Sequence, residues 1–159
     1  MTAAGSGGSP GSSDRAAVAA LLRRTPFTDF RVVVRCPHGG PAVLRNPPRD
    51  LRGRPFPTRD WLTCRALVEA VSRLEAQGGV RMLEDDPEMA GPLADAHAHH
   101  GALHDGHRVA GLGDPAHVKC LHAHLAFALD EGGSPELDWI AARADLRWPD
   151  VCCTERVAG

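Results

Sequence analysis

The sequence predicts an α+β fold that is mainly helical, with one N-terminal β-hairpin packed on about four helices. Two short runs rich in β-branched or apolar residues, at 30–36 and 42–46, flank a five-residue loop that contains two glycines, which is typical of a β-hairpin. Downstream of residue 58, apolar residues recur at helical spacing between capping residues and glycines. At 159 residues and 43% hydrophobic content, the chain has the size and composition of one domain with a core.

The domain organisation follows from composition along the chain. Residues 1–13 are rich in glycine and serine, and we expect a disordered tail there because so little apolar surface can be buried. Residues 14–149 are expected to form a single globular domain. Residues 150–159 are expected to form an irregular C-terminal tail, which carries Cys152 and Cys153.

The helical elements are predicted from their start and stop signals. Asp14 is a plausible N-cap for a short helix over 15–24, which ends before Pro26. A proline-rich connection over 47–58 follows the hairpin and excludes both a helix and a central strand. Four longer helical segments follow, of which the second contains internal glycine and proline; they cover 58–79, 86–107, 116–133 and 134–146.

Charge and hydropathy exclude several classes of function. With 18 basic and 20 acidic residues the net charge is −2, so the sequence carries no nucleic-acid or membrane-surface signal. No run approaches the ~20 apolar residues that span a bilayer, and the N-terminus lacks the pattern of a secretory signal. We therefore expect a cytoplasmic protein, in which the five cysteines are buried hydrophobes, metal ligands or reactive thiols and do not form a disulfide framework.

The cysteines lie in four segments far apart in the sequence, each near the end of an element: Cys36, Cys64, Cys120 and the adjacent Cys152 and Cys153. A thiophilic metal could join such segments, and its binding energy would stabilise the fold. The spacing is not that of a zinc finger, because no CxxC pair occurs. Composition alone therefore favours the alternative that the first three cysteines fill the core. The two tail cysteines are harder to explain as packing.

The segment "HVKCLHAH" places several metal-binding residue types together. On a helix, His117, Cys120 and His124 share one face, whereas His122 lies on another side. Lys119 flanks the thiol, where an ammonium would favour the thiolate, although a solvent-facing lysine is the simpler interpretation.

Two further patterns in the sequence could form a site. Four histidines recur at spacings of three, four and three, and we expect them to form an exposed face that takes up metal adventitiously: His97, His100, His104 and His107. A nucleophilic pair of Cys36 and His38 beside the backbone N–H groups of Gly39 and Gly40 is an alternative.

Several motifs together resemble a known family. The segments "CPHGGPAVLRNPPR", "PFPTRDWLTC", "SRLEA", "DPE" and "VKCLHAHLA" occur in order between about Arg35 and Leu129. They resemble the bacterial domain of unknown function numbered five hundred and one, of the actinobacterial type. The resemblance implies no established activity. Genes of this family often lie beside a septum-formation gene, which implies a weak link to cell division or envelope growth.

The resemblance also implies which residues matter. The family pattern contains the cysteines that correspond to Cys36 and Cys120, the latter with Lys119 and His122. At the position of Cys64 some relatives carry histidine, an exchange that suits a metal ligand better than an apolar core. A family histidine also corresponds to His97.

These observations make a metal site the leading hypothesis, with zinc as first choice and an iron–sulfur cluster as second. The predicted ligands are Cys36, Cys64, Cys120 and either Cys152 or Cys153. The predicted surrounding or substitute ligands are His38, His97, His122, His124 and Lys119. Two alternatives stay open: a non-metal helical module that binds a protein partner, and an enzyme of unassigned class that uses Cys36 and His38 or an open metal position.

Overall fold

The computed structural model of the protein describes residues 4–8 and 11–155. Within these residues the fold is α+β and mainly helical, as predicted. The strands are β1 (Ala4–Gly8), β2 (Arg31–Arg35), β3 (Pro41–Arg45) and β4 (Asp60–Leu62). The helices are α1 (Ser12–Leu22), α2 (Arg65–Ala76), α3 (Gly79–Glu84), α4 (Ala90–Leu103), the 3-10 helix η1 (Val109–Gly111), α5 (Leu121–Asp130) and α6 (Pro135–Ala141).

The strands form one antiparallel sheet in the order β1-β2-β3-β4. The predicted hairpin is confirmed as β2 and β3, with Arg31 opposite Arg45. Its turn is closed by the backbone N–H of Cys36, which donates to the Gly40 carbonyl oxygen at 2.9 Å. Gly39 has a φ of 83°, a conformation that favours glycine, so the local sequence fits the turn.

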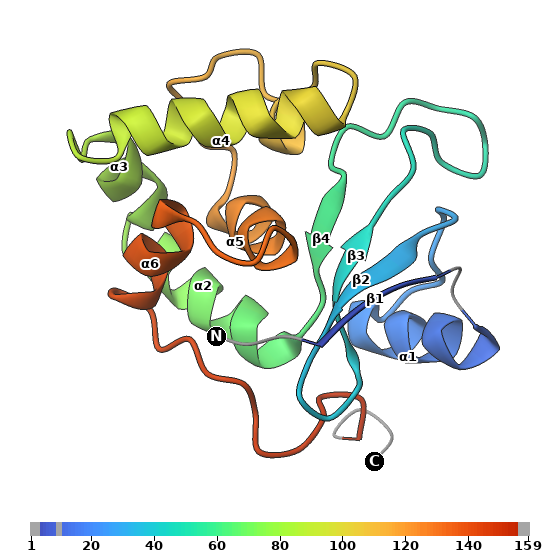
Figure 1. The fold of residues 1–159 in the computed structure, drawn as a ribbon. Coiled ribbons are helices and arrows are strands. Elements are labelled where there is room, and N and C mark those ends of the chain that lie inside the picture. The colour runs from blue at the N-terminus through green and yellow to red at the C-terminus, as the bar shows by residue number, and fades with distance from the viewer. Residues whose placement is uncertain (1–3, 9–10, 156–159) are drawn as a thin grey trace.

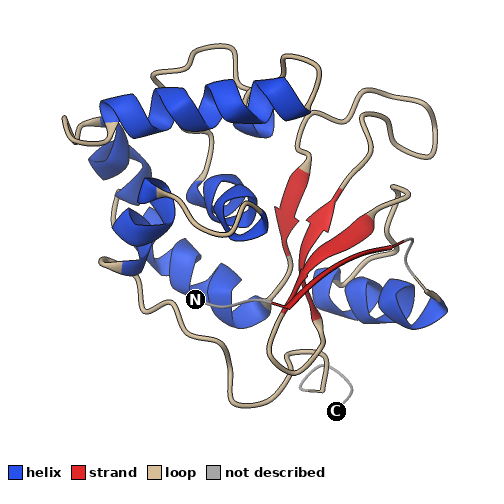
Figure 2. Ribbon diagram, in the orientation of Figure 1, coloured by secondary structure: helices blue, strands red, loops and turns tan. Residues whose placement is uncertain are grey.

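Helices cover both faces of this sheet (Figure 1 and Figure 2). On one face α1 packs over a small apolar cluster made by Val18, Phe30, Val32 and Leu44. On the other face the sheet contributes Val34, Val43 and Leu62 to the main core. In β3 the neighbours Val43 and Leu44 alternate between the two cores, whereas in β2 a register irregularity between Val32 and Val34 accompanies their division between them.

Helix α5 is the centre of the molecule. It lies between the sheet and the helices α2, α4 and α6 (Figure 1), and all but two of its residues are buried. A helix that is apolar on all sides is typical of such a position. None of the helices in the described ranges is both long and apolar enough to cross a membrane.

The structure differs from the prediction at three points before residue 85. The expected disordered tail is wrong for Ala4–Gly8, whose backbone pairs with β2, and α1 already begins at Ser12. The helix predicted from residue 58 begins only at Arg65, because Asp60–Leu62 pairs with β3 as a strand. Helix α3 is not predicted, and apart from Gly79 its residues lie between the predicted helices over 58–79 and 86–107.

The helix predicted over 116–133 begins later than expected, at Leu121. The reason is a long-range cap: a carboxylate oxygen of Glu75 accepts a hydrogen bond from the Leu121 backbone N–H at 2.6 Å. Val118 donates its backbone N–H in the same way to Glu84, at 2.7 Å. Side chains from α2 and α3 thus hold the segment before α5 in a non-helical conformation. The final helix, α6, is confirmed with Ser134 as its N-cap, but it ends at Ala141, before the predicted residue 146.

Candidate metal centres

The structure brings four of the five cysteines to one end of the sheet. Strands β2 and β4 run in the same direction, so Cys36 and Cys64, which follow them, lie at the same end. The C-terminal tail returns to this end. There the sulfurs of Cys36 and Cys152 lie 3.8 Å apart, and those of Cys64 and Cys153 also lie 3.8 Å apart. All four side chains are buried in the main core.

The hairpin turn is shaped around the Cys36 sulfur. The backbone N–H groups of His38 and Gly40 are directed at that sulfur, although burial outweighs them and raises the pKa of the thiol. Gly40 also leaves room for the tail, because a β-carbon there would lie 2.2 Å from the Cys152 sulfur. The turn therefore supplies both donors and space to a sulfur pair.

The sulfurs of Cys64 and Cys152 also face N–H or O–H donors. Burial raises the pKa of the Cys64 thiol to about 12. The backbone N–H groups of Leu67 and Ala66, at the start of α2, act in the opposite direction and lower this pKa. Burial also acts on Cys152, but the hydroxyl and backbone N–H of Thr154 hold the pKa of that thiol below its usual value. The Thr154 hydroxyl lies 3.0 Å from the Cys152 sulfur. Hydrogen bonds of this kind stabilise thiolate, which is the form that binds metals.

Cys120 lies elsewhere, and the structure does not bring it together with the other predicted cysteine ligands. It is near Glu75, at the C-terminal end of α2, whereas Cys64 is the N-cap of the same helix. A helical rise of 1.5 Å per residue separates these ends by about 16 Å. Cys153 takes the place in the thiol cluster that the sequence assigned to Cys120.

Cys120 belongs to a separate, half-buried group with Glu75 and His122, whose candidate ligand atoms lie within 4.8 Å of one another. Burial opposes protonation of His122, but Cys120 and Glu75 together raise the pKa of this histidine. The predicted helical face of His117, Cys120 and His124 is wrong, since the first two precede the helix. Lys119 is exposed.

His38 and His97 each bind a backbone carbonyl oxygen. The imidazole of His38 is exposed, and its Nε2 lies 2.7 Å from the Pro149 carbonyl oxygen, so it contacts the C-terminal tail. His97 is buried, and its Nε2 lies 3.1 Å from the His117 carbonyl oxygen. Its ring packs edge-on against that of His124 in α5, with centroids 5.2 Å apart.

The expected exposed histidine face is wrong, because α4 turns this face into the interior. His97, His100 and His104 are at most 5% exposed, and only His107 of the four is exposed. Helix α4 has few large apolar residues, so its histidines pack on α5 in their place. The ring of His100, for example, lies 4.9 Å from that of Phe127.

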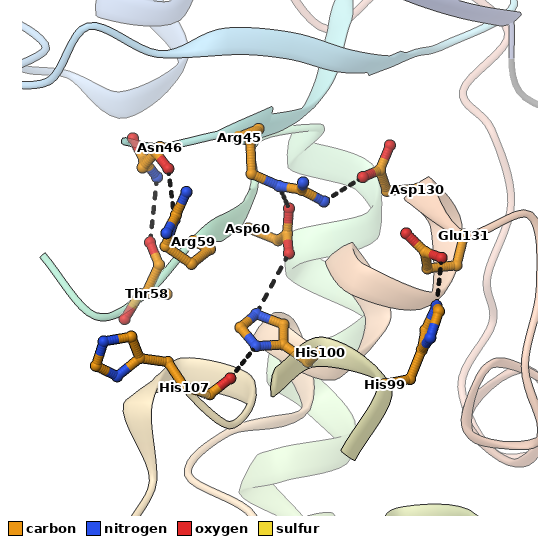
Figure 3. Close-up of polar contacts among 10 residues, drawn as sticks. All are labelled: Arg45, Asn46, Thr58, Arg59, Asp60, His99, His100, His107, Asp130 and Glu131. Carbon is orange, nitrogen blue, oxygen red and sulfur yellow. Dashed lines mark hydrogen bonds and ion pairs between the residues drawn. The ribbon is translucent and has the colours of Figure 1, made fainter. Parts of the chain in front are cut away.

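Burial of this face creates a second candidate centre, which the sequence analysis missed. Asp60, His100 and His104 are all buried, and one candidate ligand atom from each lies within 4.8 Å of the others. Figure 3 shows Asp60 between Arg45 and His100. Arg45 Nε donates to Asp60 Oδ1 at 2.6 Å, and the same guanidinium also pairs with Asp130.

The charges in this centre follow from its burial. Desolvation lowers the pKa of His100 to about 4 and that of His104 to about 3, and the nearby Arg45 adds to both shifts. Desolvation raises the pKa of Asp60 to about 6, although Arg45 opposes the rise. At neutral pH the centre therefore holds two neutral imidazoles and a carboxylate.

Two pockets open on the surface, of which the first includes Arg45 from this centre. A polar pocket of about 270 Å³ is lined in part by Arg31, Arg45, Asn46 and Arg59. Figure 3 shows Arg59 held beside the Asn46 backbone, whose carbonyl oxygen accepts from Arg59 Nε at 2.8 Å. A larger pocket of about 340 Å³ lies between α4, α5 and α6.

The comparisons with known proteins give a family resemblance. A family model described as a protein of unknown function (DUF501) matches residues 32–108. The chain thus resembles this family over just under half of its length, a segment that includes Cys36, Cys64 and the group of Asp60, His100 and His104. Neither a curated protein nor a solved structure matches the chain.

Proposed function

We propose that the protein is a small metal-binding protein and that its metal centre is formed by Cys36, Cys64, Cys152 and Cys153. The observation that carries the proposal is the convergence of four buried sulfurs from three distant segments, in two pairs of 3.8 Å. Two thiolates on one tetrahedral ion, at metal–sulfur distances of ~2.3 Å, are separated by about 3.8 Å.

Packed thiols can reach the same separation, so the hydrogen-bond donors around the sulfurs matter more than the distance. Backbone N–H groups are directed at the sulfurs of Cys36 and Cys64, and the Thr154 hydroxyl is directed at Cys152. An apolar core gains nothing from such donors, whereas a buried thiolate requires them. This difference favours metal ligation over simple packing.

The proposed role of the metal is to fasten the C-terminal tail to the domain. Residues 142–155 contain no helix or strand, yet Cys152 and Cys153 in this segment are buried. A metal bound to these two thiols and to Cys36 and Cys64 would join the tail to the hairpin and to the start of α2. Its binding free energy would then contribute to folding. The proposal assumes a reducing compartment such as the cytoplasm, in which free thiols persist.

Zinc is the first candidate, because it is commonly bound by four cysteines. A single zinc ion needs all four sulfurs about 3.8 Å from one another. Among the described residues, the groups with three or more ligand atoms within 4.8 Å do not include these thiols. Zinc binding would therefore require the two sulfur pairs to move together.

A two-iron, two-sulfide cluster is the second candidate, and the pairing of the sulfurs favours it. Such a cluster takes two thiolates on each iron, and its two irons keep the pairs apart. Cys36 with Cys152 and Cys64 with Cys153 would then each hold one iron.

Elemental analysis of protein purified without oxygen tests the proposal. We expect either one zinc per chain and no visible absorption, or two irons and two sulfides per chain with visible absorption. Cys36→Ser and Cys152→Ser should lose the metal, and the matched control Cys120→Ser should keep it. Less than ~0.2 metal per chain in the wild-type protein would refute the proposal, because structural zinc binds tightly.

A further inference from the structure

The buried group at the start of β4 contains ligand atoms that the protein itself does not pair. Within the described part of the chain, Asp60 Oδ2 and His104 Nε2 are buried and have no hydrogen-bond partner. Asp60 and His104 are 3% and 5% exposed. Buried polar atoms are nearly always paired, so a group left in this state indicates an absent partner such as an ion.

The hydrogen bonds of His100 decide which of its nitrogens is free. Its Nδ1 lies 2.6 Å from the His107 carbonyl oxygen, which can only accept, so Nδ1 carries the proton. In the neutral ring Nε2 then presents a lone pair. This atom faces Asp60 Oδ2 at 3.8 Å, too far for a hydrogen bond (Figure 3).

Arg45 prepares the carboxylate for this arrangement. It binds Asp60 Oδ1, which leaves Oδ2 directed toward His100 (Figure 3). Its own charge is shared with Asp130, so it does not neutralise Asp60 alone. A carboxylate oxygen and an imidazole lone pair that face each other repel unless a cation or a proton lies between them.

We propose that Asp60, His100 and His104 form a second metal site, for a divalent transition-metal ion bound through nitrogen and oxygen atoms. His100 lies in the last turn of α4 and His104 is the residue that ends it, and their ring centroids are 4.5 Å apart. Two histidines and one carboxylate are a ligand set of iron(II), zinc and manganese sites. Further coordination positions remain for water or for another ligand.

This site is separate from the thiol cluster. Asp60 begins β4 and Cys64 lies beyond its end, so extended backbone places them roughly 13 Å apart. The two sites also differ in ligand chemistry, since one offers only thiols and the other none. A soft thiophilic ion and a harder ion can therefore occupy them independently.

Titration of the reduced, metal-free protein with Co²⁺ tests the inference, because the spectrum of this ion reports its ligands. We expect one Co²⁺ to bind with weak ligand-field absorption, in addition to any Co²⁺ at the thiol cluster, which an intense sulfur-to-metal charge-transfer band identifies. Nitrogen-15 NMR of the imidazoles should show shifts or broadening at His100 and His104. Absence of both signals in folded wild-type protein would refute the site, and a proton between Asp60 and His100 would then explain the geometry.

Variants separate this site from the thiol cluster. Asp60→Asn and His104→Ala should weaken Co²⁺ binding at the nitrogen and oxygen site at least 100-fold, whereas the exposed neighbour His99→Ala should bind as the wild type does. Cys36→Ser should leave the weak ligand-field band unchanged. Equal affinity in His104→Ala and wild-type protein would overturn the assignment, whatever metal the thiols bind.

Discussion

Gly40 lies so close to Cys152 that a β-carbon at position 40 would be 2.2 Å from the Cys152 sulfur. The same added atom would be 3.4 Å from the Cys36 sulfur. The hairpin turn and the C-terminal tail are therefore fitted to each other at the level of a single methyl group. A side chain at this position and the observed sulfur pair cannot coexist.

Gly40→Ala should displace the tail. To avoid the added methyl group, Cys152 must rotate or move, and its contact with Cys36 is then lost. We expect a decrease of about 1–3 kcal/mol in the free energy of unfolding, as for other overpacked sites. Urea denaturation measures this loss, and limited proteolysis should show faster cleavage of the tail.

The matched control is Gly91→Ala, because an added β-carbon there meets no atom within 4 Å and the position is exposed in α4. Alanine in an exposed helix should be neutral or stabilising by about 0.5–1 kcal/mol. If both variants were equally stable and their tails equally protected, the close fit at Gly40 would be refuted.

Alkylation should separate Cys120 from the other thiols. Cys120 is half-buried, whereas the other four cysteines are at most 6% exposed. In the reduced, folded protein we expect a short pulse of iodoacetamide to modify Cys120 first, as peptide mass spectrometry can measure. In denaturant all five should react. Rapid reaction of Cys152 or Cys153 in the folded state would show that the tail is not docked.

The parts of the fold that could be predicted from sequence are those set by neighbouring residues. The hairpin follows from two apolar runs around Gly39 and Gly40, and α6 follows from Ser134 and Pro135 at its start. Strand β4 could not be predicted, because Asp60–Leu62 is short and becomes a strand only by pairing with β3. The late start of α5 depends on Glu75, 46 residues away.

The candidate sites, too, could be predicted only as far as neighbouring residues determine them. The cysteines could be recognised by their chemistry, but only the tertiary structure shows that α2 separates Cys120 from Cys64. The spacing of the histidines in and after α4 can be seen in the sequence, but the prediction that these side chains are exposed is wrong. A helix with so few large apolar residues resembles a surface helix in sequence. Asp60 is 40 residues from His100, and no local pattern links them.

Replacement of Arg45 should be among the most destabilising single changes. Arg45 binds the side chains of Asp60, which is 2% exposed, and Asp130, which is 17% exposed. Arg45→Met would leave buried carboxylates without a partner, which costs about 3–5 kcal/mol in comparable cases. Urea denaturation at neutral pH would measure this loss.

Arg147→Met provides the comparison for Arg45→Met. Arg147 also binds an aspartate, Asp145, but both side chains are mostly exposed, and we expect no measurable loss. The double variant Arg45→Met, Asp60→Asn should recover part of the lost stability, because it removes one unpaired charge. Similar stability of the two arginine variants would contradict the structural role of Arg45.

The stability of the metal-free protein should depend on pH through His124. Burial, with the nearby His97 and His100, lowers the pKa of His124 to about 3 in the folded protein, against ~6.5 in the unfolded chain. The unfolded chain therefore binds one more proton between these values. The contribution of His124 to the free energy of unfolding is therefore fully present above pH ~6.5. It is lost as the pH falls toward about 3, by about 1.4 kcal/mol per pH unit.

His124→Gln should remove this contribution. Between pH 6 and pH 4 the free energy of unfolding of the variant should fall less steeply than that of the wild type. The difference between the two slopes should correspond to the uptake of about one proton on unfolding. Other buried histidines act in the same direction and Asp60 acts in the opposite one, so the difference between the two proteins is the informative quantity. The exposed His107→Gln is the matched control and should retain the wild-type slope. Parallel curves for His124→Gln and wild type would mean that His124 is not held in its neutral form by burial.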